Sequence, residues 1–230
     1  MLTMIRRNTY AKNVAFKALD YAITRCTRNC EMFIDEGGLK TVFGAYMYEP
    51  STKKERSDQT ANELYLLEII CQLFLHCVDI RYLRLRAKFE EQEMVKTERT
   101  VELLVKYQTR VDDAELKHRR ENPDEEPVQP ITEGGEISDG ELLRYSRQSD
   151  HGLSHVEMAS IIIAFLATSG NKKLRSRIDQ LLNQQDLSMN DLHKTIVNYT
   201  RMMGDGQIDE EQIKNKEVLK TLAQLLKEGE

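Results

Sequence analysis

The sequence of 230 residues has few cysteines, few prolines and no long apolar run. Its most hydrophobic stretch, residues 64–78, is too short to span a bilayer and is interrupted by Glu68, Gln72 and His76, so we expect no membrane association. The basic first residues are not followed by an apolar segment with a small-residue cleavage site, which argues against a secretory signal. Four cysteines without such a signal indicate free thiols in a reducing compartment, the cytosol or the nucleus.

Catalytic motifs are also absent from the sequence. It contains no P-loop, no dinucleotide-binding glycine pattern and no serine-nucleophile elbow. His151 and His155 lie four positions apart, but no glutamate follows His151, so they do not form the HExxH motif of zinc proteases. The four cysteines lack the spacing of zinc ligands, and we expect them to be structural thiols that pack inside the fold. They are Cys26, Cys30, Cys71 and Cys77.

One segment resembles a calcium-binding loop. Residues 204–211, GDGQIDEE, are similar to the second half of an EF-hand loop. If the second glycine takes the required glycine position, Arg201 and Met203 stand where carboxylate ligands are needed, and Gln212 replaces the bidentate glutamate. We interpret the segment as a turn that ends one helix, with Asp209 as the N-cap of the next. The sequence therefore predicts no metal, no cofactor and no enzymatic activity.

The hydrophobic pattern is helical. No segment shows sustained alternation of apolar and polar residues, whereas apolar residues recur at spacings of three and four, so we predict an all-α fold. The predicted helices span about residues 9–25, 62–78, 80–111 with a break, and 156–167, followed by three more toward the C-terminus. We expect N-caps at Ser188 and at Ser154, the latter in a capping box with Glu157, although Asp150 could cap an earlier start. Residues 64–78 and 156–167 are apolar on almost every side, as expected of buried helices.

The stretch FIDEGGLKTVFGAYM, residues 33–47, predicts a tight corner between two helices. Apolar residues recur at helical spacing on both sides of a Gly-Gly pair. Gly37 or Gly38 can take a positive φ at little cost, which ends one helix and lets the next leave at a steep angle. Corners of this kind are typical of armadillo and HEAT-like solenoids, in which each helical unit buries its apolar face against its neighbours.

Charge is distributed unevenly along the chain. Between Asp112 and Glu141 eleven acidic residues accompany three lysines and arginines, and three of the four prolines lie there as well. Such a stretch buries too little apolar surface to offset its ordering entropy, so we predict a mobile acidic linker over residues 112–140. It would separate armadillo-like helical repeats in residues 1–111 from a C-terminal helical subdomain in residues 141–230.

Two basic groups are candidates for binding. Arg81, Arg84 and Lys88 can share one helix face and could contact phosphates or an acidic peptide, although nearby glutamates dilute that charge. The second group, residues 172–177, alternates basic with apolar residues, which is also how the solvated side of an amphipathic helix looks. The candidate partner-binding residues are Lys40, Tyr46, Arg81, Arg84 and Lys88.

Several blocks of the sequence resemble the beta-catenin-like protein 1 family. They occur in the family's order and at similar spacing, and their combination is more specific than any single block. The blocks are VAFKALDYAI from residue 14, NCEMFIDEGGLKTVFGAYM from 29, EIICQLFLHC from 68, SDHGLSHVEMASIIIAFL from 149 and YTRMMGDG from 199. The resemblance covers nearly the whole chain but only the C-terminal part of the family, so we expect most of the family's armadillo repeats to have no counterpart here.

The resemblance implies a nuclear, armadillo-like scaffold of the spliceosome. Family members associate with the assembly that contains the Myb-like cell division cycle five-like protein, and vertebrate members are known to bind nuclear localisation signals and the antibody-diversifying deaminase. Our leading hypothesis is therefore a non-enzymatic protein-interaction scaffold in pre-mRNA splicing. The alternative is a helical RNA-binding module that uses the basic face between Arg81 and Lys88. We also expect self-association, because a solenoid that lacks neighbouring repeats exposes an apolar face.

Overall fold

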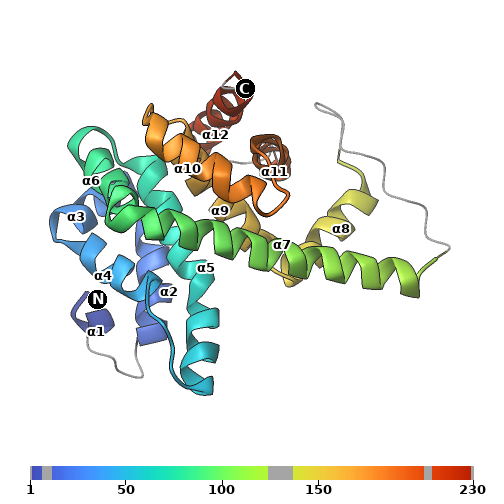
Figure 1. Ribbon diagram of the computed structural model, residues 1–230, viewed down its shortest axis with the longest axis horizontal. Coiled ribbons are helices and arrows are strands. Elements are labelled where there is room, and N and C mark those ends of the chain that lie inside the picture. Colours follow the sequence, from blue (N-terminus) through green and yellow to red (C-terminus); the bar gives the residue numbers. More distant parts are fainter. Residues whose placement is uncertain (1, 7–11, 124–136, 205–208, 229–230) are drawn as a thin grey trace.

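A computed structural model describes residues 2–6, 12–123, 137–204 and 209–228. Helices occupy most of these residues and no strand occurs among them, so the all-α prediction is confirmed (Figure 1). The helices are α1 Leu2–Arg6, α2 Lys12–Ile23, α3 Thr27–Asp35, α4 Gly38–Tyr46, α5 Lys53–His76, α6 Asp79–Glu90, the short 3-10 helix η1 Gln92–Met94, α7 Val95–Glu121, α8 Asp139–Asp150, α9 Leu153–Ala167, α10 Lys172–Asn183, α11 Met189–Met202 and α12 Glu210–Glu228.

The first seven helices form a sequential array. Each helix from α1 to α7 packs against the next one along the chain, which is the arrangement expected of an armadillo-like solenoid. The predicted corner lies between α3 and α4. Gly37 adopts the left-handed conformation with φ of 74°, while Gly38 begins α4 so close to Phe33 that an added Cβ would lie only 2.4–2.6 Å from three atoms of the aromatic ring. The two glycines are therefore needed for different reasons, one for conformation and one for close packing.

Helix α5 begins at Lys53, nine residues before the predicted start. Thr52 and Glu55 form a capping box, in which the Thr52 hydroxyl accepts from the Glu55 backbone N–H and the Glu55 carboxylate accepts from the Thr52 N–H. Beyond this polar first part, the segment that the pattern predicted to be buried does lie in the core, where Leu67, Ile69 and Ile70 have no solvent exposure.

A left-handed turn separates α6 from α7, which confirms the predicted break. Gln92, Glu93 and Met94 all have positive φ, and Met94 is buried at the turn. Helix α7 then continues to Glu121, so residues 112–121 are helical and the predicted linker start at 112 is wrong. The extension is stabilised because Val111 and Glu115 are buried in it. Most of the remaining predicted linker, residues 124–136, lies outside the described residues.

Helix α9 is the centre of the molecule. It packs on α5 and α7 on one side and on α10, α11 and α12 on the other, as its place behind α7 in Figure 1 suggests. Buried residues from both halves of the chain form one continuous apolar core. The C-terminal helices therefore complete the core of the N-terminal array, and the predicted separation into a repeat domain and a C-terminal subdomain is not what the packing shows.

The start of α9 differs from the predictions. Gly152, with φ of 109°, is the N-cap, so neither Ser154 nor Asp150 caps the helix. The Glu157 carboxylate instead accepts a hydrogen bond from the Tyr145 hydroxyl at 2.8 Å. Other predicted caps are confirmed. Ser188 forms a capping box at the start of α11, and the Gln212 N–H donates to the Asp209 carboxylate at the start of α12.

Candidate partner-binding surfaces

Lys40 and Tyr46, both on α4, have opposite environments. The Lys40 side chain is exposed, whereas Tyr46 is only 2% exposed. The Tyr46 hydroxyl lies 2.8 Å from the Thr100 hydroxyl, its ring meets Phe43 edge-on, and burial raises its pKa. Tyr46 is therefore a packing residue that joins α4 to α7, and its prediction as a partner-binding residue is wrong.

Arg81 and Arg84 extend from α6 to the end of α3. The Arg81 guanidinium donates to both carboxylate oxygens of Asp35 at 2.7–3.1 Å and lies 3.3 Å from Glu31. The Arg81 hydrogen bond lowers the pKa of Asp35. Arg84 donates to the backbone carbonyl of Ile34 at 3.2 Å and also approaches Asp35. These contacts connect α6 to α3, and the Arg84 side chain is still 46% exposed.

Lys88, the third cation of this basic group, is also paired within the chain. Its Nζ donates to the Glu91 carboxylate at 2.7 Å. Each of the three cations that motivated the RNA-binding alternative thus has a carboxylate partner close by. A nucleic acid would have to compete with those carboxylates, so the geometry does not favour this alternative.

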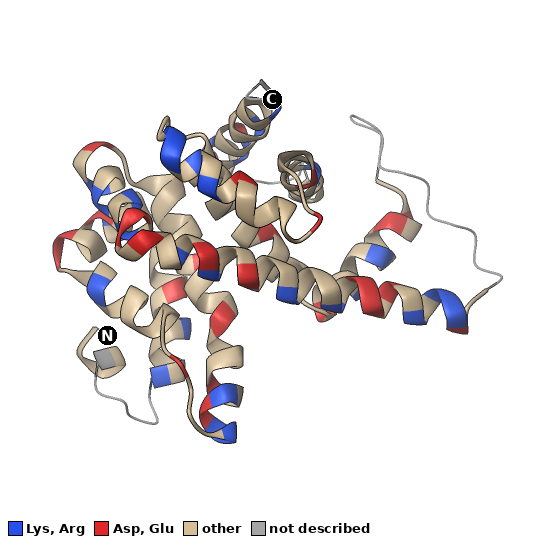
Figure 2. Cartoon of the chain, viewed as in Figure 1, with Lys and Arg blue, Asp and Glu red and all other residues tan. Residues whose placement is uncertain are grey.

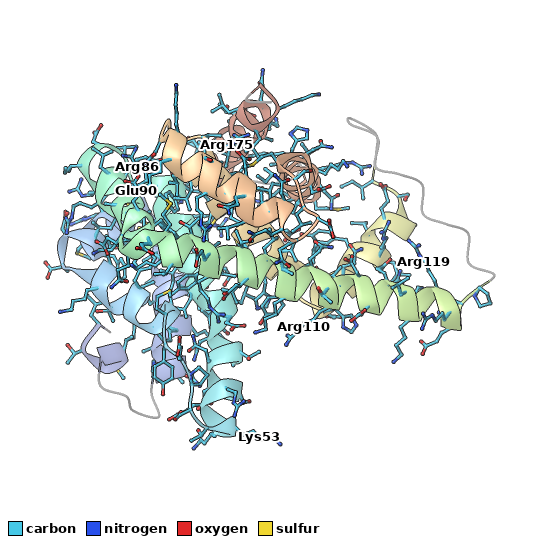
Figure 3. The ribbon with its side chains drawn as sticks, viewed as in Figure 1. Lys53, Arg86, Glu90, Arg110, Arg119 and Arg175 are labelled. Atoms are coloured by element: carbon cyan, nitrogen blue, oxygen red, sulfur yellow. The ribbon has the colours of Figure 1, made fainter. Side chains whose placement is uncertain are left out.

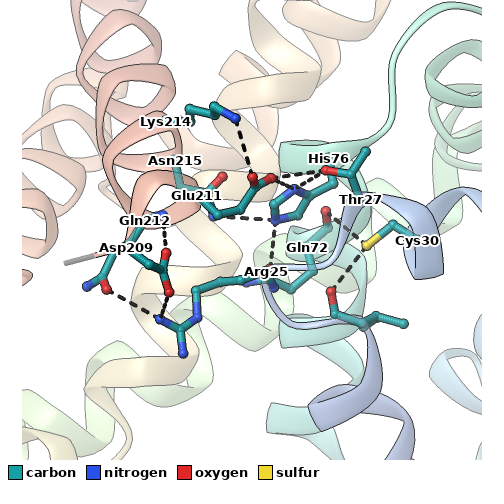
Figure 4. Close-up of polar contacts among 11 residues, drawn as sticks. Arg25, Thr27, Cys30, Gln72, His76, Asp209, Glu211, Gln212, Lys214 and Asn215 are labelled. Atoms are coloured by element: carbon teal, nitrogen blue, oxygen red, sulfur yellow. Dashed lines mark hydrogen bonds and ion pairs between the residues drawn. The ribbon is translucent and has the colours of Figure 1, made fainter.

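A polar cluster connects the last helix to the N-terminal array, and the residue pattern did not predict it (Figure 4). His76 is buried near the end of α5, with its Nδ1 3.0 Å from Glu211 of α12 and its Nε2 3.3 Å from Asn215. Thr27 also donates to Glu211, and Arg25 pairs with Asp209 at 2.8 Å. The partners lie more than a hundred residues apart in sequence, so no local signal could have identified the cluster.

The same cluster does not have the arrangement of a nucleophile and its base. The Cys30 thiol donates to the backbone carbonyls of Ile23 and Gln72, and burial raises its pKa, so the thiol stays protonated. Burial lowers the pKa of His76 although Glu211 opposes the shift. Each polar group faces a protein partner, and the arrangement stabilises the docking of α12.

A second buried polar cluster crosslinks α5 and α7. The Glu63 carboxylate, almost fully buried, accepts from Arg99 at 3.1 Å, from Lys106 and from the Tyr107 hydroxyl at 2.7 Å. The Tyr107 ring stacks on His155 of α9 at a centroid distance of 3.6 Å, and burial lowers the pKa of His155 to about 4. A neutral His155 packs as an aromatic ring here, so it is a structural residue of the interface between α7 and α9.

An apolar groove lies open on the surface between α6, α9 and α12. Its volume is about 460 Å³, and apolar residues form most of its lining. Tyr82 and Phe165 form the floor, while Val218, Leu222 and Leu225 of α12 form one wall. Phe74 lies beneath the floor, stacked on Phe165 at 5.3 Å and edge-on to Tyr82 at 5.9 Å. The groove forms only when α12 docks beside α6 and α9, so the local sequence pattern could not predict it either.

The residues that the structure describes contain neither a candidate metal site nor a candidate membrane span. In that part of the chain no group of three or more His, Cys, Asp or Glu side chains is placed to hold a metal ion. None of the helices described is long and apolar enough to cross a membrane. The cysteines are free thiols, three of them buried, as predicted.

Comparison with known proteins identifies the family. The family described as "Catenin-beta-like, Arm-motif containing nuclear" matches residues 1–197. Beta-catenin-like protein 1 of Mus musculus, Bos taurus and Homo sapiens is 29% identical over 215 residues, which are 91% of this chain and 37% of each relative. The chain thus spans little more than a third of the length of these relatives. Since the family match covers most of an all-helical chain, the protein belongs to the catenin-beta-like family of Arm-motif containing nuclear proteins.

Proposed function

We propose that this chain is a non-enzymatic protein-interaction scaffold that acts in the nucleus, in pre-mRNA splicing by the spliceosome. The observation that carries the proposal is the family match, which extends over residues 1–197 and is to Arm-motif containing nuclear proteins. Helical solenoids present extended surfaces to partners, and their function depends on shape and surface chemistry more than on reactive groups.

The buried polar groups of the chain support the proposal that it acts as a scaffold. Its most densely packed polar clusters, around His76 and Glu63, connect helices to one another. The buried thiol of Cys30 has a raised pKa, the opposite of what a nucleophile needs. Buried polar groups with protein partners rigidify a fold, and a rigid fold is what a binding surface requires.

The proposed partners are spliceosomal proteins, among them the Myb-like cell division cycle five-like protein. A direct test is to add the tagged full chain to nuclear extract, crosslink it and identify the attached proteins by mass spectrometry. We expect splicing factors to be enriched over a tag-only sample. An Ile162→Asp variant, which places a charge in the core, is the control for capture through unfolded protein. Equal recovery of splicing factors with the tag alone would refute the proposal.

Self-association remains a prediction of the repeat architecture. Helices α1 and α2 expose the apolar side chains of Met4, Val14 and Tyr21, which a second copy could cover. Light scattering over a range of concentrations tests it. A constant monomer mass would contradict self-association and would leave the scaffold proposal unaffected.

A further inference from the structure

The groove between α6, α9 and α12 has the shape of a helix-binding site. Val218, Leu222 and Leu225 follow one another at spacings of four and three along α12, so they form a straight apolar ridge beside the floor. Val218 is 38% and Leu225 46% exposed, which is unusual for large apolar residues next to an apolar groove. The surface therefore offers an apolar strip in which Val218 and Leu225 are exposed, while Leu222 between them is only 4% exposed.

The floor of the groove is rigid. Tyr82 donates a long hydrogen bond from its hydroxyl to the Phe165 carbonyl, and Phe74 contacts both rings from below. Phe89, fully buried, lies against Phe74 in turn. An aromatic floor held from beneath loses little conformational entropy when a ligand binds, and this preorganisation favours affinity.

Glu217, the charged side chain in the groove lining, is paired with Lys220 at 2.9 Å. The two helical segments beside the groove carry a net positive charge, although the chain as a whole has a net charge of −5. Helix α6 carries four cationic and two acidic side chains, and α10 carries four and one. The fold brings these two basic segments to the same end of the molecule, where Arg86 of α6 donates to the Ser169 carbonyl just before α10 (Figure 2). Figure 3 shows Arg86 and Arg175 on these neighbouring helices.

Lys172 and Lys173 are exposed cations that follow the groove-lining residue Thr168 in sequence. They occupy the first turn of α10, four residues after Thr168, which lines the groove. Arg86 and Arg175 have carboxylate partners in Glu90 and Asp179 at 2.9 and 3.3 Å. The two lysines can therefore attract a ligand's negative charge.

We propose that this groove binds an amphipathic α-helix of a partner protein, with apolar residues on one face and acidic residues flanking them. The inference rests on the proposed scaffold function and names the site and the partner chemistry. The apolar strip matches the i, i+3, i+4 and i+7 anchors of a helix laid in a groove. The positive charges of Lys172 and Lys173 beside the groove favour a partner helix with acidic flanking residues and raise its association rate. An RNA strand fits poorly, because the floor and the α12 wall are apolar.

The test measures binding of a fluorescein-labelled synthetic helix to the full chain by fluorescence anisotropy. The probe carries leucine on one face and glutamate beside it, and a second probe carries lysine in place of every glutamate. We expect the acidic probe to bind at least about tenfold more tightly than the basic one at low ionic strength, with the difference shrinking as salt screens the charges.

Two pairs of variants locate the site. Val218→Asp with Leu225→Asp should weaken the acidic probe at least about tenfold, since it removes two apolar anchors. The control is Ile213→Asp, on the same helix and 46% exposed, which lies outside the groove lining and should change binding less than about twofold.

Charge reversal supplies the second pair. Lys172→Glu with Lys173→Glu should weaken the acidic probe about fivefold. Lys53→Glu with Lys54→Glu makes the same change in the first turn of α5, at the opposite end of the molecule in Figure 3, and should have no effect. All four substituted lysines are exposed, so circular dichroism should show an unchanged fold.

Each other outcome overturns the inference in a distinct way. Equal binding of both probes would show that the groove has no preference for acidic helices. Binding that is unaffected by the Val218 and Leu225 substitutions would show that the probe does not bind in this groove. A chain that is dimeric without the probe and becomes monomeric with those substitutions identifies a second copy as the occupant. Splicing factors recovered equally by wild type and the groove variant would refute the groove but not the scaffold function, whereas no recovery by either would refute the function itself.

Discussion

Helix α9 has twelve buried residues, whereas α8, which is separated from it by two residues, has none. Helix α9 is surrounded by apolar side chains from five other helices besides α8. Helix α8 is held by polar contacts instead: Arg144 and Arg147 pair with Glu115, Glu141 pairs with Arg201, and Tyr145 donates to Glu157. Two adjacent helices of similar length are thus held in the molecule by different interactions, α9 by apolar packing and α8 by ion pairs and hydrogen bonds.

The difference sets where stability is concentrated. Burying one large apolar side chain stabilises the folded state by about 1.5–3 kcal/mol, and α9 buries several such side chains. Ion pairs with a partly exposed partner contribute about 0–1 kcal/mol each, and the arginines that pair with the buried Glu115 are 22–33% exposed. We therefore expect α9 to unfold only with the whole molecule, while α8 can detach locally without loss of the fold.

The largest expected effect comes from shortening a central side chain of α9. Ile162 has no solvent exposure, so Ile162→Ala should leave a cavity and destabilise the protein by about 2–5 kcal/mol, measured by urea denaturation. Leu143→Ala on α8, at 63% exposure, is the matched control and should cost less than about 0.5 kcal/mol. Similar losses for both variants would contradict the contrast between the helices.

The junction between α8 and α9 comes next. Gly152→Ala should destabilise the protein by about 2 kcal/mol, because φ of 109° strains any residue with a Cβ and that Cβ would lie 2.5 Å from the Tyr107 ring. Gly44→Ala provides the control. Gly44 lies within α4 with open space around it, so its replacement should stabilise by about 0.5–1 kcal/mol. A neutral Gly152→Ala would mean that the junction lies farther from Tyr107 of α7 than described.

Glu157, which joins α9 to Tyr145 of α8, should make stability depend on pH. Burial raises the pKa of Glu157 from 4.5 to about 7, so the folded chain retains a proton that the unfolded chain releases, and stability should fall as pH rises from about 4.5 to 7. Glu157→Gln keeps an acceptor for Tyr145 but cannot ionise. At pH 8 it should be about 1–2 kcal/mol more stable than wild type, with no gain at pH 4, by urea denaturation.

Asp20 and Glu68 also contribute to the pH dependence of stability. Burial raises the pKa of both carboxyls, and the nearby Asp20 charge raises that of Glu68 further, so wild type and Glu157→Gln share this part of the pH dependence. Only the difference between the two proteins reports Glu157. A difference that does not change with pH would show that Glu157 ionises in the folded state as it does in water.

The smallest effect on global stability is expected from releasing α8. Glu115→Gln weakens the pairs with Arg144 and Arg147 and should cost about 1 kcal/mol or less overall. Amide hydrogen exchange should nevertheless increase over α8 while α9 stays protected. Glu121→Gln, at an exposed ion pair with Lys117, should leave exchange in both helices unchanged. Loss of protection in α9 as well would show that the helices unfold as one unit.

The core could be predicted from the sequence, because its signals are local. The apolar residues of α9 and of the second half of α5 lie side by side in the chain, and a helix that is apolar on almost every side is predicted to be buried. The start of α5 was missed although Thr52 and Glu55 have the spacing of a capping box, so the signal was present.

Contacts between distant residues could not be predicted in the same way. The charged end of α7 resembled a linker because the partners of Glu115 lie on α8. The basic face of α6 resembled a binding site because Glu31 and Asp35 lie on another helix. Tyr46 looked like a surface residue because its partner, Thr100, is more than fifty positions away. Each error arises where tertiary packing outweighs the local pattern.

The central place of α9 has a consequence for synthesis on the ribosome. Helices α5 and α7, whose buried faces meet α9, are made before it, so the nascent chain carries both walls of the core while the middle is missing. Proteins of this size expose apolar surface while such contacts are incomplete, and incomplete chains are prone to aggregate. Cooperative folding should therefore begin only after residue 167 has left the exit tunnel, and molecular chaperones are expected to bind the chain until then.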